Sequence, residues 1–175
     1  MENYFWIGFV GAILALLFAL MQGRKVLSFS EGNETMQKIA AAIRKGANAY
    51  LKHQYTTVAK VFLVVFVILL VLVWANMLDN WFIPFAFLTG GVYSALAGFV
   101  GMKIATNANA RTAQAASESL NKGLNVAFSS GSVMGFTVVG LGILDITVWF
   151  HILKYIAGYG PEQIAQTMVM FGMGA

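Results

Sequence analysis

The chain has 175 residues, of which 59% are hydrophobic and only 10% are charged, and its formal net charge is +4. A soluble domain carries about 25% charged residues, and a soluble chain of this length is too small to bury so much apolar surface, so the composition excludes a soluble globular domain. The absence of cysteine excludes disulfides, thiolate metal sites and cysteine nucleophiles within these residues.

Four apolar stretches have the length of membrane-spanning helices, at about residues 4–22, 61–78, 81–102 and 124–153. A hydrocarbon core of about 30 Å needs about 20 helical residues, and in lipid only a helix satisfies its own backbone polar groups. A fifth stretch starts near Ile164 and is still apolar at Ala175. We therefore predict an all-α, polytopic transmembrane bundle with four complete spans and the start of a fifth. Residues 1–175 would be a fragment, the N-terminal part of one membrane domain.

The positive charges predict the orientation of these spans. Glu2 precedes the first stretch and Arg24 and Lys25 follow it, which is typical of a retained anchor rather than a signal peptide. Connection 23–60 contains seven Lys or Arg residues and connection 103–123 contains three, whereas the remaining connections contain only Lys154. The positive-inside rule places the first two connections in the cytoplasm and the N-terminus outside. Because the basic residues lie in membrane connections, they do not indicate nucleic acid.

Aromatic residues give an independent indication of the same orientation. Trp and Tyr favour the membrane interface, where one end of the ring system is apolar and the other is wet. In the predicted orientation seven of them gather at the outer interface: Tyr4, Trp6, Trp74, Trp81, Trp149, Tyr155 and Tyr159.

The cytoplasmic segment 33–60 has a helical pattern. Its apolar residues recur at spacings of three and four, with basic residues mostly between them. Ser30 or Asn33 would cap its start, where Glu31 and Glu34 are favourable. We expect this helix to run directly into the second span and to project beyond the bilayer. The alternative is a basic amphipathic helix lying on anionic lipid.

The spans differ in the size of their side chains. In the third span, Gly91/Ala95, Ser94/Gly98 and Ala97/Gly101 are small residues four apart, and the fourth contains a GxxxG at 131–135. Small residues at this spacing let two helix backbones approach closely, so we expect both spans to pack tightly against other protein. The second span is bulky on all sides and suits a lipid-facing position. This difference predicts a bundle of more than four helices.

The sequence predicts no catalytic, cofactor-binding or metal-binding residue. His53 and His151 are each alone in the sequence and are expected to be solvated or packed. Asp145 is the one acidic residue within a span; it belongs to an ion path, or else reaches the outer interface or a donor on a neighbouring helix. Lys103 and Arg111 flank the third span, either as topology determinants or as residues that steer an anionic substrate.

Several long blocks resemble membrane-bound, ion-pumping pyrophosphatases. They begin with SEGNETMQKI at residues 30–39, and together they cover nearly the whole chain in order: 30–39, 43–55, 94–105, 109–116 and 127–142. The resemblance implies a homodimeric pump of well over a dozen helices, with its N-terminus outside, that couples pyrophosphate hydrolysis to outward movement of H+ or Na+. It also implies a bacterial plasma-membrane location.

The same resemblance implies a requirement for Mg²⁺, and in some members for K⁺. The acidic motifs that hold pyrophosphate and Mg²⁺ in the family come later in the chain than Ala175, so no catalytic residue is assigned here. The expected chemistry is attack by a water held by carboxylates, with Mg²⁺ neutralising phosphate oxygens. Two other readings stay open: a non-catalytic scaffolding subunit of a multi-helix transporter, and, with little support, a small channel or lipid-binding protein.

Overall fold

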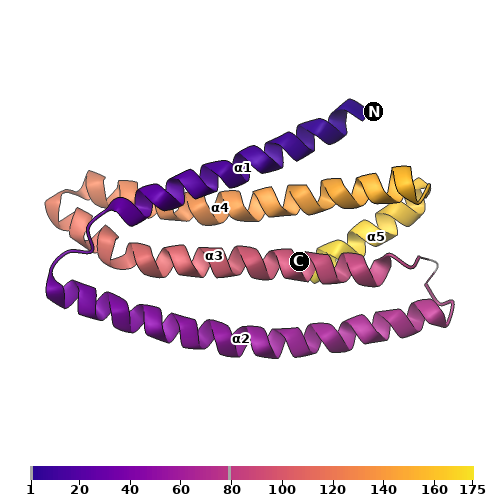
Figure 1. Cartoon of the computed structure of the whole chain (residues 1–175), viewed down its shortest axis with the longest axis horizontal. Coiled ribbons are helices and arrows are strands. Elements are labelled where there is room, and N and C mark those ends of the chain that lie inside the picture. Colours follow the sequence, from indigo (N-terminus) through magenta and orange to yellow (C-terminus); the bar gives the residue numbers. More distant parts are fainter. Residues whose placement is uncertain (1, 79) are drawn as a thin grey trace. The chain divides into compact units, whose positions relative to one another are not determined.

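A computed structural model describes residues 2–78 and 80–175, with side chains from Trp6 onward except at 79. The described residues contain helices and turns but no strand (Figure 1). Tyr4, one of the aromatic residues predicted at the outer interface, lies outside the described side chains. The helices are α1 (Glu2–Ser28), α2 (Glu34–Trp74), α3 (Ile83–Glu118), α4 (Leu120–His151), a π-helical turn (Ile152–Ile156) and α5 (Pro161–Gly174).

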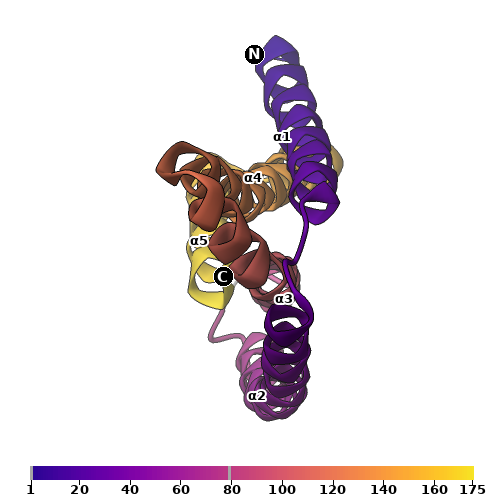
Figure 2. The same ribbon diagram turned by 90° about the vertical axis from the view of Figure 1, so that its left-hand side faces the viewer.

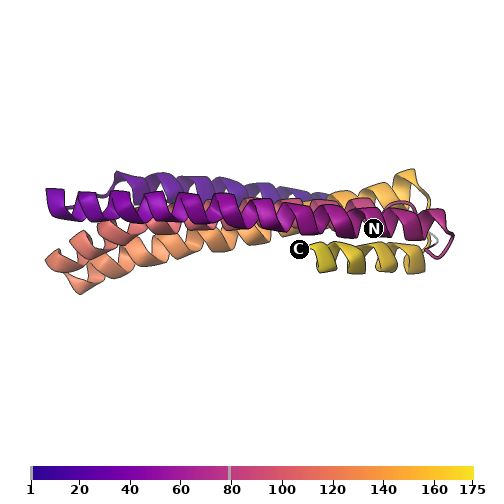
Figure 3. The same cartoon turned by 90° about the horizontal axis from the view of Figure 1, so that it is seen from below.

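Four of these helices, α1 to α4, are long and apolar enough to cross a membrane. This confirms the predicted all-α, polytopic fold. The continuity of segment 33–60 with the second span is also confirmed, because α2 is one unbroken helix of 41 residues (Figure 3). No proline or glycine breaks the helix near Val61, so the backbone hydrogen bonds continue from the amphipathic part into the apolar part. How far α2 projects beyond the bilayer stays a prediction.

The second connection differs from a simple loop. Residues 103–118 are rich in alanine, a strong helix former, and they extend α3 well beyond the predicted span. Only Ser119 separates α3 from α4. Its hydroxyl accepts a hydrogen bond from the backbone N–H of Lys122 at 3.3 Å and so caps α4. The chain therefore reverses direction with almost no loop.

The chain divides into two compact units, and each of α1 to α4 contributes residues to both. Unit 1 comprises residues 1–13, 55–96 and 141–175, and unit 2 comprises residues 14–54 and 97–140. The core of unit 2 is formed by Val26 of α1, Ile104 and Ala108 of α3 and Val133 of α4. This apolar cluster brings three helices together within the unit.

In unit 1, α5 packs against α3 and the end of α4. Phe171 of α5 packs with Ala86 of α3, Trp149 of α4 and Leu153 of the π-helical turn. α3 and α5 approach each other closely, since a Cβ added at Gly90 would lie 2.5 Å from the carbonyl oxygen of Phe171. Side chains larger than hydrogen do not fit at such a crossing, which is the geometry that small residues permit between membrane helices.

The helices differ in how much of their apolar surface the chain itself covers. Only 6% of the most apolar window of α2 is buried, compared with 39% for α3 and 33% for α4. That the bulky second span faces lipid stays a prediction. The expected tight packing is present at Gly91, which meets Phe62, and at Gly101, which meets Met134. Gly131 and Gly135 have no atom within 4 Å of an added Cβ, so the partner expected for the GxxxG stays a prediction.

Candidate functional site

The polar residues of unit 2 gather around the linker between α1 and α2. Glu31 lies in this linker, which Figure 2 shows as a thin coil between the two helices. Its Oε1 lies 2.8 Å from Arg44 Nη1 and 2.8 Å from Arg111 Nη1, and its Oε2 accepts a hydrogen bond from Arg44 Nη2 at 3.2 Å. A forked contact with Arg44 and a second cation from α3 hold this carboxylate on both sides. Glu31 therefore joins the linker to α2 and α3.

Arg111 is the more deeply placed of the two cations, with only 11% of its side chain exposed. Its Nε donates to the carbonyl oxygen of Phe29 at 3.0 Å, and its Nη1 donates to that of Asn107 at 2.6 Å. The guanidinium thus satisfies a carbonyl left unpaired where α1 ends. Arg111 thus joins the linker to α3; its readings as a topology determinant or as a residue that steers an anionic substrate stay predictions.

The conformation of the linker depends on two neighbouring residues. Gly32 has φ +85°, in the left-handed region, and an added Cβ would lie 2.8 Å from Gln114 Oε1. Asn33 then caps α2, because its Oδ1 accepts a hydrogen bond from the backbone N–H of Met36 at 2.9 Å. Of the two caps that the sequence allows, the structure therefore uses Asn33, whereas the Ser30 hydroxyl accepts from the N–H of Gly32.

A pocket of about 220 Å³ lies beside this cluster. Its polar lining comes from Ser30, Arg111, Gln114, Glu118, Lys122 and Asn125. Lys122 pairs with Glu118 at 2.7 Å, and Lys25 donates to Asn125 Oδ1 at 3.2 Å. Because these cations already have acceptors, an anion would have to compete for each of them.

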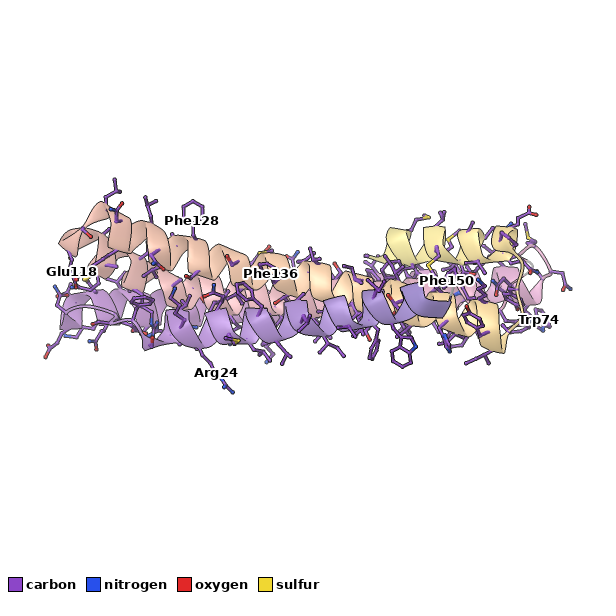
Figure 4. The ribbon with its side chains drawn as sticks, turned by 90° about the horizontal axis from the view of Figure 1, so that it is seen from above. Arg24, Trp74, Glu118, Phe128, Phe136 and Phe150 are labelled. Atoms are coloured by element: carbon purple, nitrogen blue, oxygen red, sulfur yellow. The ribbon has the colours of Figure 1, made fainter. Side chains whose placement is uncertain are left out.

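Arg24 and Lys103 do not join this pocket. Arg24 points away from α1 (Figure 4). Lys103 donates to Asn48 Oδ1 at 2.6 Å and lies over the ring of Phe99, so it links α3 to α2. Neither side chain lines the pocket, and the two readings of Lys103 stay predictions.

The electrostatics of the linker follow from its ion pairs. The hydrogen bond from Arg44 is the largest cause that lowers the pKa of Glu31 below 4.5, and the charges of Arg111 and Arg44 act in the same direction against partial desolvation. A carboxyl with a lowered pKa stabilises the folded state above its unfolded pKa. That stabilisation is lost as the pH falls through the folded pKa.

Asp145 lies in unit 1 and is 3% exposed. Its carboxyl lies beside Thr89 of α3. The Thr89 hydroxyl donates to the carbonyl oxygen of Ala86 at 3.1 Å and accepts from Trp149 Nε1 at 2.7 Å. Asp145 Oδ2 is buried and has no partner among the described residues. The outer interface, a donor on a neighbouring helix and an ion path all stay predictions for Asp145.

The two histidines are in different units. His151 stacks in a tilted arrangement on Tyr155, with ring centroids 4.9 Å apart, and His53 is exposed on α2. Within residues 2–78 and 80–175, no group of three or more His, Cys, Asp or Glu side chains comes together.

Sequence reasoning missed the polar contact of Asn80. This residue is fully buried in unit 1, where its Nδ2 donates to Thr167 Oγ1 of α5 at 2.6 Å. Its Oδ1 accepts from the backbone N–H of Phe82 at 2.9 Å, just before α3 begins. An asparagine immediately before a helix is a capping signal that was available in the sequence. No signal in the sequence indicated that its partner would be Thr167, 87 residues away.

One family model and several curated proteins match most of this chain. The family model described as "Inorganic H+ pyrophosphatase" matches residues 13–175. A protein of Bacteroides thetaiotaomicron, provisionally named a K(+)-stimulated pyrophosphate-energized sodium pump, is 48% identical over 178 residues, which cover 98% of this chain and 24% of that protein.

Two further relatives extend the comparison. The "K(+)-insensitive pyrophosphate-energized proton pump 2" of Moorella thermoacetica is 43% identical, covering 94% of this chain and 23% of its own length. The "K(+)-stimulated pyrophosphate-energized sodium pump" of Thermotoga maritima is 38% identical, covering 82% of this chain and 19% of its own length. The chain thus spans about a quarter or less of the curated relatives it matches.

The Glu31 cluster generates a prediction about the linker. Glu31→Gln removes the charge that both arginines contact, at a cost of about 1–2 kcal/mol. Backbone amides of residues 29–36 should then exchange with deuterium about 5–30-fold faster at neutral pH, measured by mass spectrometry. Glu118→Gln, which breaks an exposed pair instead, is the control. Equal exchange in Glu31→Gln and the unmodified protein would show that the cluster does not hold the linker.

Proposed function

Because the chain belongs to the family of inorganic H+ pyrophosphatases, we propose that it is the N-terminal transmembrane part of a pyrophosphate-energised ion pump. The whole protein would couple hydrolysis of inorganic pyrophosphate to outward translocation of H+ or Na+. The observation that carries this proposal is the family match across residues 13–175, together with relatives named as pyrophosphate-energized pumps that are similar along most of the chain.

Residues 1–175 would form the N-terminal part of a single membrane domain rather than a separate module. The shared use of α1 to α4 by both compact units supports this, since neither unit has a helix set of its own apart from α5. The complete protein would be a homodimer in the bacterial plasma membrane, as the family resemblance implies.

The proposed chemistry would lie outside this segment. Mg²⁺ prefers carboxylate and other oxygen ligands, usually with the phosphates of the substrate. Three of the acidic side chains described here already have neighbours: Glu31 is held by two arginines, Glu118 pairs with Lys122, and Asp145 lies beside Thr89. We propose that Mg²⁺ is bound by residues beyond Ala175. A dependence on K⁺ would be decided there as well, since the relatives' names include both K⁺-stimulated and K⁺-insensitive pumps.

Pump activity is tested with the full-length protein in inverted membrane vesicles. Adding pyrophosphate with Mg²⁺ should acidify the vesicle interior or drive uptake of labelled Na⁺, and a non-hydrolysable diphosphonate should do neither. Hydrolysis without ion movement would contradict the pump. Absence of both, with a different polypeptide co-purifying, would instead favour the scaffolding subunit.

The N-terminus would lie outside, with the linker around Glu31 and the α3–α4 reversal in the cytoplasm. The count of basic residues in the two connections supports this orientation. It also places Lys60 at the cytoplasmic end of the apolar part of α2.

Single cysteines test the orientation, because the chain contains none of its own. Met77 is 71% exposed near the α2–α3 connection, and Ser117 is exposed near the α3–α4 reversal. Asn80 is unsuitable for this purpose because it is fully buried. In intact cells an impermeant thiol reagent should label Met77→Cys, whereas Ser117→Cys should react only after the membrane is opened. The reverse pattern, or labelling of both from one side, would refute the orientation.

A further inference from the structure

An apolar groove runs along the contact between α2 and α3 within unit 1. Small residues on the two helices, Ala59, Gly91 and Ala95, leave a space of about 370 Å³. Leu63 and Val92 border it and are 63% and 51% exposed, so the groove opens toward the surroundings of the helices. Its position on the least buried helix means that the described chain does not cover it.

Both ends of the groove are closed by contacts between α2 and α3. At one end the Tyr55 hydroxyl donates to the carbonyl oxygen of Ala95 at 2.7 Å. At the other end Phe66 packs edge-to-face on Phe85, with ring centroids 5.7 Å apart. The helix rises about 9 Å from Lys60, the last charged residue before the apolar run, to Phe66. The part of the groove that lies in the hydrocarbon is therefore shorter than one leaflet of about 15 Å, and it is too short for a helix that crosses the bilayer along it.

A cation lies where the groove meets the membrane surface. Lys60 lines a shallow cleft together with Tyr55, Ala59 and Leu63, which also line the groove. It is followed directly by the uncharged run 61–78, so its ammonium group stands at the level of the lipid headgroups. Within the part of the chain that the structure describes, Lys60 has no ion-pair partner.

We propose that this groove binds one acyl chain of an anionic phospholipid whose phosphate contacts Lys60. Lipid is the occupant that fits the depth of the groove, its apolar lining and its open side. An anionic headgroup is the one that the positive charge selects, because a lysine near the surface attracts acidic lipids. The site needs only that α2 crosses the bilayer, and it is independent of pump activity.

Native mass spectrometry of the full-length protein in detergent tests the site with two probes, dioleoyl phosphatidylglycerol and dioleoyl phosphatidylcholine. The unmodified protein should retain phosphatidylglycerol preferentially. Lys60→Gln should weaken its binding about fivefold, the effect of one cation at the surface, and leave phosphatidylcholine unchanged. Ala59→Phe fills the groove and should weaken both lipids. Lys45→Gln, an exposed cation on the same helix outside the groove, is the matched control.

Three results would overturn the proposal. The first is equal retention of the two lipids by the unmodified protein. The second is an unchanged preference for phosphatidylglycerol in Lys60→Gln, whose exposed side chain leaves helix packing intact. The third comes from phosphatidylglycerol with a photoreactive acyl chain, which should label residues 55–66 or 88–95 in vesicles. Labelling confined to other segments would mean that a neutral lipid or a later helix occupies the groove.

Discussion

The structure depends on the fact that hydrocarbon offers no hydrogen-bond partner to a peptide backbone. Every residue that enters the bilayer must therefore satisfy its N–H and C=O groups within its own helix. This constraint explains why the described chain consists of long helices with short connections, and why α2 exposes Val64, Val67 and Ile68. In water these side chains would be unfavourable, whereas in lipid they cost nothing. Packing between helices then needs small residues rather than a large apolar core.

Within that constraint, polar residues serve mainly to join helix ends. Glu31 holds the α1–α2 linker against α2 and α3, Asn80 holds the α2–α3 connection against α5, and Lys103 links α3 to Asn48. These contacts already pair the charged and amide groups with other protein groups, so the same groups are not free to bind a substrate. The segment therefore carries structural polar contacts, and the comparisons identify the family through sequence similarity rather than through a visible active site.

The helices were predictable because each leaves a local signature: apolar length, period and flanking charge. The exact positions of the turns between the helices were less predictable. The alanine-rich stretch 103–118 carries a helix signal in its composition, whereas nothing in the composition marks Ser119 as the point where the two helices meet. The Glu31–Arg111 and Asn80–Thr167 contacts join residues far apart in sequence. The close approach at Gly90 involves α5, which begins at Pro161 rather than near Ile164 as the sequence predicted. Such contacts have no local signal.

The central claim is that lipid surrounds the apolar part of α2. Spin labels placed singly along residues 60–74 of the reconstituted protein measure this directly, through collisions with oxygen and with a water-soluble nickel complex. Oxygen, which concentrates in hydrocarbon, should reach a maximum near Ile68 and decrease toward Lys60 and Trp74, with the nickel complex showing the opposite profile. High accessibility to the nickel complex across the whole stretch would contradict the account.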